Sequence, residues 1–409
     1  MSLRSILRAR VRGATDRLMR PYVSQVESTI RSAEANLLKA AGEPHESNST
    51  VESSLPSTRF HMALHELRTM ELEGVPKGCR QVLSVGAQGR WYFEWFRAAY
   101  GDVDRHVGIE AFEPEPEDLP EYATWIENTA DQMSGVETDS IDLVFAGQTT
   151  EHLWSTELVG FLCEAHRILR AGGLLVVDSP NRLVTQYLNW SHGGHSIEIS
   201  ADEAASLLQL AGFDVIDAHG LWQCVSAGVV MELESDLDDP AIFVRRASSG
   251  REDPDACFVW WINARRADRE PVEADLQRQV DDLFSRHWPT RVSRGFFRGP
   301  GEDLYLRPGD TGRVAATLPF MLHAGAWCVS LGLASGSWSD VTNPRLVLEL
   351  PGSHEVYSWE LTDRQVEIRF ELPSVYFALS LVLHADSVSS PVRIEFPIDL
   401  RPAGASGAS

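Results

Sequence analysis

The chain has 409 residues, of which 43% are hydrophobic and 23% are charged. This composition is typical of a globular protein with a sizeable core, and the length predicts about two to three domains. No apolar run reaches the roughly 18 residues of a membrane span, and the N-terminus lacks the apolar region of a secretory signal. Five scattered cysteines without CxxC spacing argue against a disulfide scaffold or a zinc ribbon, so we expect a cytoplasmic protein.

The net charge of −23 disfavours a general nucleic-acid-binding protein, because the phosphate backbone attracts Lys and Arg. The charge is uneven, since residues 1–20 hold six Arg and one Asp. A basic tip on an acidic chain predicts a protein partner or an anionic surface.

Residues 1–42 are predicted to form a basic amphipathic helix, followed by a polar linker over 43–57. The apolar seam fits packing on the protein's own body and homo-oligomerisation equally well. The first arginines fit a peripheral contact with the inner face of a membrane as well as a solvated terminus. The seam has alternating spacings of four and three residues: Met19, Val23, Val26, Ile30, Ala33 and Leu37.

Residues 58–268 alternate between short apolar runs and helical patterns, which predicts an α/β domain with a doubly wound, mainly parallel sheet. Helices are expected at Leu158–Leu169 and Ala201–Leu210, the second with a capping box made by Ser200 and Glu203. The predicted strands are Gln81–Val85, His106–Glu110, Ile141–Ala146, Leu174–Asp178, Asp214–Ala218 and Cys257–Ala264.

A connecting helix is predicted within 269–292, at Val272–Leu283, and a β-sandwich over 293–402, followed by a disordered tail at 403–409. Most aromatic side chains of the sandwich should be core, but Trp338 lies in a loop and is expected to be exposed. The predicted sandwich strands are Val314–Phe320, Trp327–Leu333, Arg345–Leu350, Val356–Leu361, Val366–Leu372, Tyr376–His384 and Val392–Ile398.

The first strand of the α/β domain runs into a turn of small residues, Gly86, Ala87 and Gly89. In a doubly wound sheet this turn lies at the carboxyl edge, where ligands bind, and small residues let the backbone approach a ligand closely. The turn lacks the middle glycine of GxGxxG, so it is not a dinucleotide fingerprint.

An acidic residue, Glu110, ends the second strand and is placed to accept hydrogen bonds from both ribose hydroxyls of a nucleoside. Glu113 is a less well placed alternative. Asp131 is expected on the adenine side, with Met133 either packing on the ring or filling the core.

Three further segments carry a family resemblance: Ile141–Leu153, with DLVF followed by EH; His166–Asp178, with RILRAGG; and Leu210–Val215, with AGF. Together with the glycine turn, they resemble the class I S-adenosylmethionine-dependent methyltransferases over residues 58–268. The resemblance implies a seven-stranded sheet whose last strand, Cys257–Ala264, is antiparallel. It also implies S-adenosylmethionine as cofactor, held by the residues that match the family's motifs, Gly86, Gly89, Glu110 and Asp131. Ala87 in the turn and Gln148 after the fourth strand are further cofactor-binding candidates.

The sequence departs from the family pattern at three positions. Ser84 replaces the usual acid before the first glycine, and Gln88 and Arg90 replace later glycines. Ser84 cannot supply a carboxylate for the cofactor's amino group, so backbone carbonyls or Gln148 would have to take over that contact.

Three histidines are candidates for the catalytic base: His152, His192 and His195. Each also has a plausible structural role, such as bracing or packing its loop. The spacing of His192, His195 and Glu198 matches no specific metal signature, so no metal is expected. Asp178 and Asn181 end the fifth strand and are further acceptor-site candidates.

The sequence therefore predicts a methyltransferase acting on a hydroxyl of a glycan, a lipid-linked glycan or another large acceptor. This acceptor class rests on the architecture alone. The alternatives are a small-molecule O- or N-methyltransferase, a NAD-linked or nucleotide-sugar Rossmann enzyme, and a non-catalytic carbohydrate- or protein-binding module on a degenerate scaffold.

Overall fold

A computed structural model of the chain describes residues 58–188, 190, 192, 194–234, 237, 239–287, 291–292, 296–297, 304–317, 320–350, 354–395 and 398–403. The predicted N-terminal helix and linker, and all of the predicted tail except Ala403, lie outside these residues. Within the described part, no helix has the length and apolar character needed to cross a membrane.

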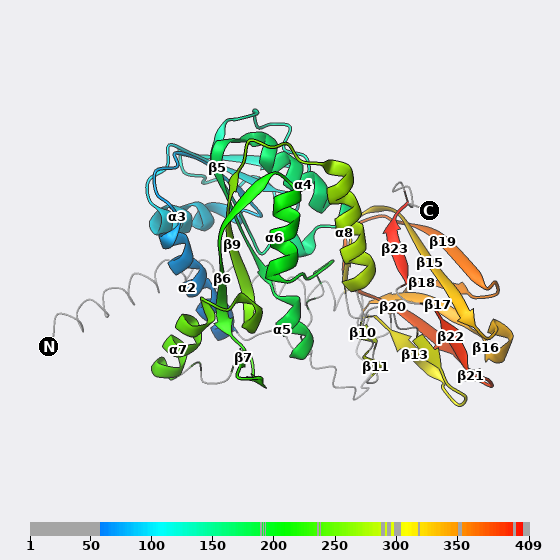
Figure 1. Cartoon of the computed structure of the whole chain (residues 1–409). Helices are drawn as coiled ribbons and strands as arrows, with labels where there is room; N and C mark the ends of the chain where they lie inside the picture. Colours follow the sequence, from blue (N-terminus) through cyan, green and yellow to red (C-terminus); the bar gives the residue numbers. More distant parts are fainter. Residues whose placement is uncertain are drawn as a thin grey trace.

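The first domain is built on one seven-stranded sheet with the order β3-β2-β1-β4-β5-β9-β6 (Figure 1). The strands pair in parallel except for β9, which is antiparallel to both of its neighbours. The strands are β1 (Gln81–Val85), β2 (Arg105–Glu110), β3 (Ala123–Glu127), β4 (Ile141–Gly147), β5 (Leu169–Pro180), β6 (Phe213–Gln223) and β9 (Cys257–Arg266).

The predicted doubly wound sheet with an antiparallel last strand is therefore confirmed. Strand β3 was not predicted, because Ala123–Glu127 is an edge strand with a single buried residue, Trp125. Strands β5 and β6 are longer than predicted, since both pair along most of β9.

Helices cover both faces of the sheet because successive strand residues point to opposite sides. Leu83 belongs to the core shared with α4, α6 and α8, whereas Val82 belongs to the core shared with α2 and α3. The helices are α2 (Thr58–Gly74), α3 (Gly89–Tyr100), α4 (Ser155–Ile168), α5 (Arg182–Tyr187), α6 (Ala201–Leu210), α7 (Pro240–Gly250) and α8 (Glu273–His287), with short 3-10 turns η1 (Thr150–His152) and η2 (Pro254–Ala256).

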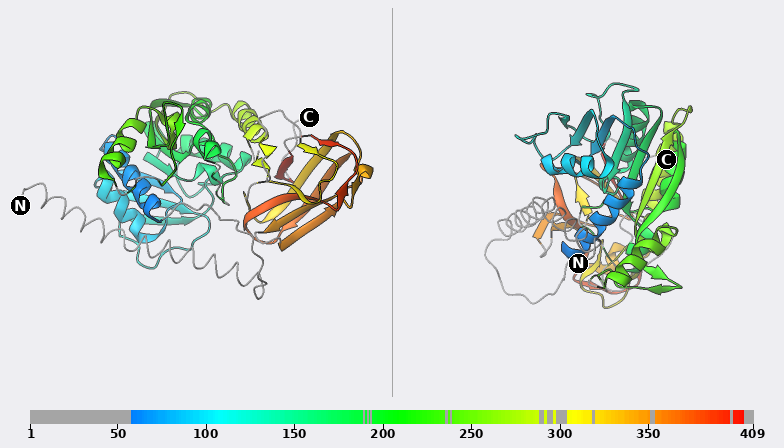
Figure 2. Two further views of the ribbon diagram at one scale, coloured as in Figure 1. Left: turned by 90° about the horizontal axis from the view of Figure 1, so that it is seen from below. Right: turned by 90° about the vertical axis from the view of Figure 1, so that its left-hand side faces the viewer.

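The C-terminal region forms two five-stranded antiparallel sheets whose side chains share one hydrophobic core, as expected of a sandwich (Figure 2). One contains β12 (Leu304–Leu306), β15 (Gly325–Ser335), β19 (Gln365–Leu372), β22 (Val392–Ile394) and β23 (Asp399–Pro402). The other contains β13 (Gly312–Ala316), β14 (Phe320–Leu322), β17 (Arg345–Leu350), β18 (His354–Glu360) and β20 (Tyr376–Ala385). Three minor pairs are β7 (Val225–Ser226) with β8 (Val229–Val230), β10 (Arg291–Val292) with β11 (Phe296–Phe297), and β16 (Val341–Thr342) with β21 (Ser387–Val388).

Two predictions for this region were wrong. The single strand expected at Val314–Phe320 is two strands, β13 and β14. Trp338 is buried, because it lies in a 3-10 turn, η3 (Trp338–Asp340), and its indole N–H donates to the Asp363 carbonyl at 3.0 Å.

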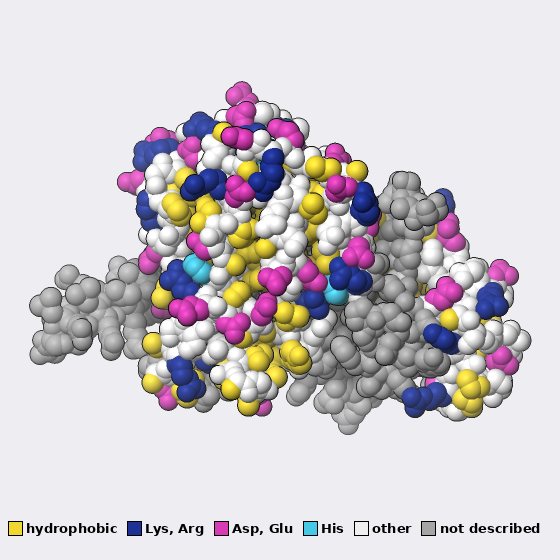
Figure 3. Space-filling view, in the orientation of Figure 1, with side chains coloured by type: hydrophobic (Ala, Val, Ile, Leu, Met, Phe, Trp, Pro, Cys, Tyr) yellow, Lys and Arg dark blue, Asp and Glu magenta, His cyan; other side chains and the backbone are white. Residues whose placement is uncertain are grey.

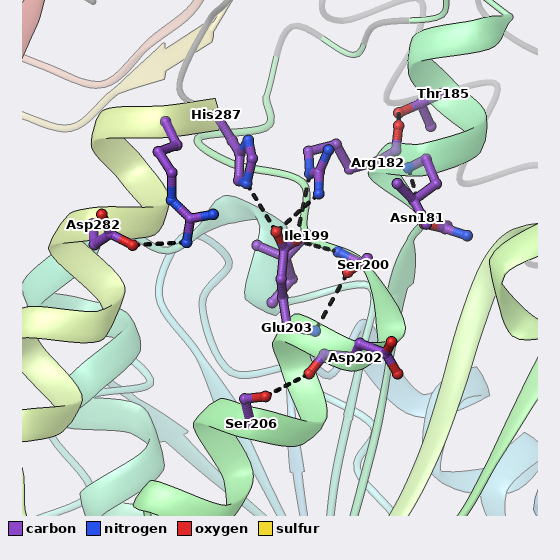
Figure 4. A network of polar contacts seen from close by, with 12 residues as sticks. Asn181, Arg182, Thr185, Ile199, Ser200, Asp202, Glu203, Ser206, Asp282 and His287 are labelled. Carbon is purple, nitrogen blue, oxygen red and sulfur yellow. Dashed lines mark hydrogen bonds and ion pairs between the residues drawn. The ribbon is translucent and has the colours of Figure 1, made fainter. Parts of the chain in front are cut away.

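Helix α8 follows the α/β sheet and packs on α4, close to the all-β region. At its C-terminal end, the His287 ring is 2.8 Å from the Glu203 carboxylate on α6 (Figure 4). Arg182 and the Ser200 N–H also donate to this carboxylate, each at 2.8 Å, and Ser200 accepts the return bond of the predicted capping box. This network fixes α8 to α6 and α5.

Candidate active site

The glycine turn between β1 and α3 lies at the carboxyl edge of the sheet. Gly86 and Gly89 have φ values of +73° and +69°, a backbone region that favours glycine. The Thr149 hydroxyl donates to the Val85 carbonyl at 3.3 Å, and a Cβ at Gly86 would lie 3.3 Å from that hydroxyl oxygen. The methyl group of Ala87 is fully buried, so this residue can offer a ligand only its backbone.

Glu110 ends the neighbouring strand β2 at the same edge. The Gly86 N–H donates to the Ile109 carbonyl at 2.9 Å, which ties the glycine turn to this strand end. The Glu110 carboxylate accepts the Phe112 N–H at 2.8 Å and is 8% exposed. Burial raises the pKa of Glu110, and hydrogen bonds from nearby backbone N–H groups oppose that rise. By contrast, Glu113 is exposed.

Asp131 lies between β3 and β4 in the chain and packs against helix α4. A Cβ at Gly160 would lie 2.6 Å from the Asp131 Cβ, so this glycine lets the loop approach the helix. Met133 is fully buried in the core, which agrees with the core-packing alternative for this residue.

Ser84 forms a buried pair with His106, whose ring nitrogen Nε2 is 2.8 Å from the serine hydroxyl. Both residues are 0% exposed, and burial lowers the pKa of His106 to about 3. The position at which the family has an acid therefore holds a neutral, buried, hydrogen-bonded pair.

Gln148 follows β4 with a φ of +54°, a left-handed conformation that is unfavourable for a side chain with a Cβ. Its backbone N–H donates to the Asp178 carbonyl at 2.9 Å, and its side-chain amide donates to the Asp178 carboxylate at 2.7 Å. On the far side, Arg68 of α2 donates to the same carboxylate at 3.1 Å. The side-chain amide of Gln148 is thus directed to Asp178.

The three candidate histidines lie together beside the end of β4. The ring centroids of His152 and His195 are 5.0 Å apart, and those of His192 and His195 are 4.5 Å apart. Burial lowers the pKa of all three histidines, so they are neutral near pH 7 and able to accept a proton.

Two sequence candidates at the end of β5 have structural contacts. Asn181 caps α5 by accepting the Leu183 N–H at 3.0 Å, and its amide donates to the Cys257 carbonyl at 3.1 Å. Asp178 is the partner of Arg68 and Gln148 described above. We therefore assign Asn181 a structural role instead of acceptor binding.

Glu151, Arg68 and His323 were missed by the sequence reasoning. Glu151 is 1% exposed beside His152, and burial raises its pKa to about 8. The EH pair carries a usable signal for this residue, because the acid directly precedes a candidate histidine. For Arg68 and His323 the sequence carries no signal, because each reaches the site from a different part of the fold.

His323 comes from the all-β region, between β14 and β15. Its ring centroid is 5.9 Å from that of Phe112, two residues after Glu110, and its Nδ1 is 3.6 Å from Glu157 on α4. The C-terminal region thus reaches the edge of the sheet at which the glycine turn and the histidines lie.

A family profile described as a methyltransferase domain matches residues 83–177, from β1 to within β5. The chain contains a methyltransferase domain. This domain is similar to a protein of Mycolicibacterium smegmatis named a probable S-adenosylmethionine-dependent methyltransferase, with 37% identity over 151 residues, 35% of this chain and 55% of that protein. A Mycobacterium tuberculosis protein of the same description is 30% identical over 158 residues, covering 35% of this chain and 52% of that protein.

Both relatives are named as probable S-adenosylmethionine-dependent methyltransferases, the class that the sequence motifs resemble. The chain spans about half the length of the curated relatives that it matches. Among solved structures, a SAM-dependent methyltransferase from Archaeoglobus fulgidus is 19% identical, with a TM-score of 0.37, and the match covers 51% of this chain and 94% of that one.

Proposed function

We propose that the protein transfers a methyl group from S-adenosylmethionine to a hydroxyl oxygen of a large acceptor, such as a glycan or a lipid-linked glycan. The observation that carries this proposal is the set of His152, His192 and His195, which converge at the carboxyl edge of the sheet beside the glycine turn.

The cofactor is assigned to the glycine turn and to the acids around it. The backbone of Gly86, Ala87 and Gly89 offers close approach, and Glu110 offers a carboxylate to the ribose hydroxyls. Asp131 is assigned to the adenine amino group. The side-chain amide of Gln148 already donates to Asp178. We therefore assign the contact with the cofactor's amino group to the backbone of Gln148.

Methyl transfer is an in-line displacement that needs alignment and removal of one proton. S-adenosylmethionine supplies the methyl group on a sulfonium sulfur, and the S–C bond breaks as the O–C bond forms. The proton of the acceptor hydroxyl moves to an imidazole nitrogen of His152 or His195, which burial keeps neutral before the reaction. His192 is assigned to contact with the acceptor.

Two features support a large acceptor. The all-β region reaches the site through His323, so a second surface adjoins the carboxyl edge of the sheet. On that region Tyr357 and Trp359 form a half-buried stacked pair, with ring centroids 5.5 Å apart, of a kind that packs well against sugar rings.

The first test is calorimetric titration of the full chain with S-adenosylhomocysteine. We expect one binding site of about micromolar affinity. Glu110→Ala removes the ribose acceptor and should weaken binding at least about tenfold, because each lost 1.4 kcal/mol is a factor of ten. Glu113→Ala is the matched control, since this exposed acid lies only three residues away, and it should bind like the wild type.

A folded wild type that does not bind the ligand would favour the second candidate, a non-catalytic binding module. The buried pair of Ser84 and His106 is the observation that keeps this candidate, because it replaces an acid that the family uses. If the ligand binds, an acceptor screen comparing glycans with small hydroxylated and amine-bearing metabolites separates the proposed acceptor class from a small-molecule methyltransferase.

A further inference from the structure

Glu151, His152 and His195 form a compact cluster of possible metal ligands. One ring nitrogen of each histidine and one carboxylate oxygen all lie within 4.8 Å of one another. They come from two segments, η1 after β4 and the loop between α5 and α6. The backbone joins these segments, because the Ser196 N–H donates to the Glu151 carbonyl at 2.6 Å and the Ser196 hydroxyl donates to the His152 carbonyl at 3.1 Å.

Hydrogen bonds fix which nitrogen of each ligand histidine remains available. Nδ1 of His152 is 2.6 Å from the carbonyl oxygen of Gly194, which can only accept, so Nδ1 carries the proton and Nε2 keeps its lone pair. Nδ1 of His195 is 2.8 Å from the Glu198 carboxylate, which directs the same tautomer. Imidazoles held this way by a carbonyl or a carboxylate are typical of metal ligands.

His192 has the opposite tautomer. The Gly194 N–H donates to its Nδ1 at 3.1 Å, so in the neutral ring the proton lies on Nε2. His192 is therefore a hydrogen-bond donor next to the cluster and is not one of its ligands.

Glu151 supplies the independent observation. It is 1% exposed, and neither carboxylate oxygen has a hydrogen-bond partner of normal geometry. Ionising a carboxyl buried in this way is costly, and a bound cation is one group that offsets the cost. Glycine at position 194 leaves room for two of the histidine rings. A Cβ there would lie 3.2 Å from a ring carbon of His192 and 3.3 Å from the His152 ring.

We propose that Glu151, His152 and His195 bind one divalent transition-metal ion of the Zn²⁺, Co²⁺ or Fe²⁺ type. Two imidazoles and one carboxylate suit these ions, whereas Mg²⁺ and Ca²⁺ prefer sets of oxygen ligands. Three protein ligands leave at least one coordination position open.

The role of the ion rests on the proposed function. A hydroxyl oxygen that binds at the open position loses its proton more readily, because the cation stabilises the resulting oxyanion. The proton then passes to solvent, and the ion replaces the histidine base of the preceding section. This role of the ion favours acceptors with a hydroxyl group that can bind the metal, either alone or together with a neighbouring oxygen.

The test is metal titration of the untagged full chain after treatment with a chelator. Calorimetry with Zn²⁺, and the visible absorption of bound Co²⁺, should give one ion per chain and much weaker binding of Mg²⁺. Glu151→Gln and His195→Gln each remove a ligand and should lower the affinity by about a hundredfold or more. Glu198→Gln, which weakens the support of His195 without removing a ligand, should lower it by about ten- to a hundredfold.

His192→Gln is the matched control, because it removes a neighbouring imidazole that is not a ligand, and it should keep wild-type metal affinity. Binding of S-adenosylhomocysteine, measured on each variant, shows that its fold is intact.

A wild type that binds this ligand but neither Zn²⁺ nor Co²⁺ overturns the metal site and leaves the proposed methyl transfer standing. Metal binding that survives Glu151→Gln and His195→Gln overturns the assignment, whereas stoichiometric metal binding without S-adenosylhomocysteine binding overturns only the proposed function.

Discussion

At the scale of single residues, the carboxyl edge of the sheet depends on charges placed out of contact with water. Asp178 is 0% exposed and shares its carboxylate between Arg68 and Gln148. Burial raises the pKa of Asp178, and the positive charge of Arg68 and the amide of Gln148 oppose that rise. Two hydrogen bonds to Asp178 hold Gln148 in its left-handed backbone conformation.

Arg68→Met should lower the free energy of unfolding by about 3–5 kcal/mol, because it leaves a buried charge without its partner. The double variant Arg68→Met with Asp178→Asn should be more stable than Arg68→Met alone, since the uncompensated charge is gone. Urea denaturation of both variants measures this. Arg80→Met, which breaks an exposed ion pair with Asp104, is the control and should change little. A double variant no more stable than Arg68→Met would contradict this account.

At the scale of elements, α8 is fixed by one polar contact near its middle and another at its C-terminal end. Near its middle, the Gln277 amide donates at 2.8 Å to Ser155, the first residue of α4. At its C-terminal end, His287 pairs with Glu203 of α6 (Figure 4). Burial alone would raise the pKa of Glu203, but hydrogen bonds from His287 and the Ser200 N–H, and the charge of Arg182, lower it to about 2.

This pKa predicts an acid-sensitive contribution to stability. The folded pKa lies below the unfolded value of 4.5, so the contribution is complete above pH 4.5 and is lost as the pH falls toward 2. Between pH 5.5 and 3.5, the wild type should lose about 1 kcal/mol more stability than Glu203→Gln, which cannot titrate there. Urea denaturation across that range measures the difference, with Asp202→Asn, an exposed neighbour on α6, as the control. Parallel pH profiles for Glu203→Gln and the wild type would exclude this contribution.

At the scale of the whole molecule, one hydrophobic core joins the methyltransferase domain to the all-β region. The Trp154 ring, at the start of α4, is 4.8 Å from Trp327 of β15 and 5.8 Å from Phe284 of α8, measured between ring centroids. All three side chains are at most 9% exposed. The visible outer surface, in contrast, mixes acidic and basic side chains over its described part (Figure 3).

The shared core predicts that the two regions unfold together. Trp327→Ala should cost about 3–5 kcal/mol and should divide one calorimetric transition into two, because it removes the central contact between them. Trp359→Ala is the control, since this half-buried side chain packs within the all-β region. A wild type that already unfolds in two separate transitions would show that this contact does not couple the regions.

The residue spacing alone was sufficient to predict much of the α/β domain. Buried parallel strands are continuous apolar runs, so β1, β2 and β4 were predicted to within one residue, and the capping box at Ser200 marked the start of α6. The glycine turn and Glu110 could be predicted because they directly follow such strands, and local chain geometry fixes where a strand ends.

Other features depended on contacts between segments far apart in the chain. Three such features are the burial of Trp338, the partners of Asp178 and the contact of His323 with Phe112. The histidines were candidates from the sequence, but their tautomers follow from two hydrogen bonds to Gly194 and one to Glu198. The sequence determined which groups are present, whereas burial and hydrogen-bond partners, which arise only on folding, decided their chemical state.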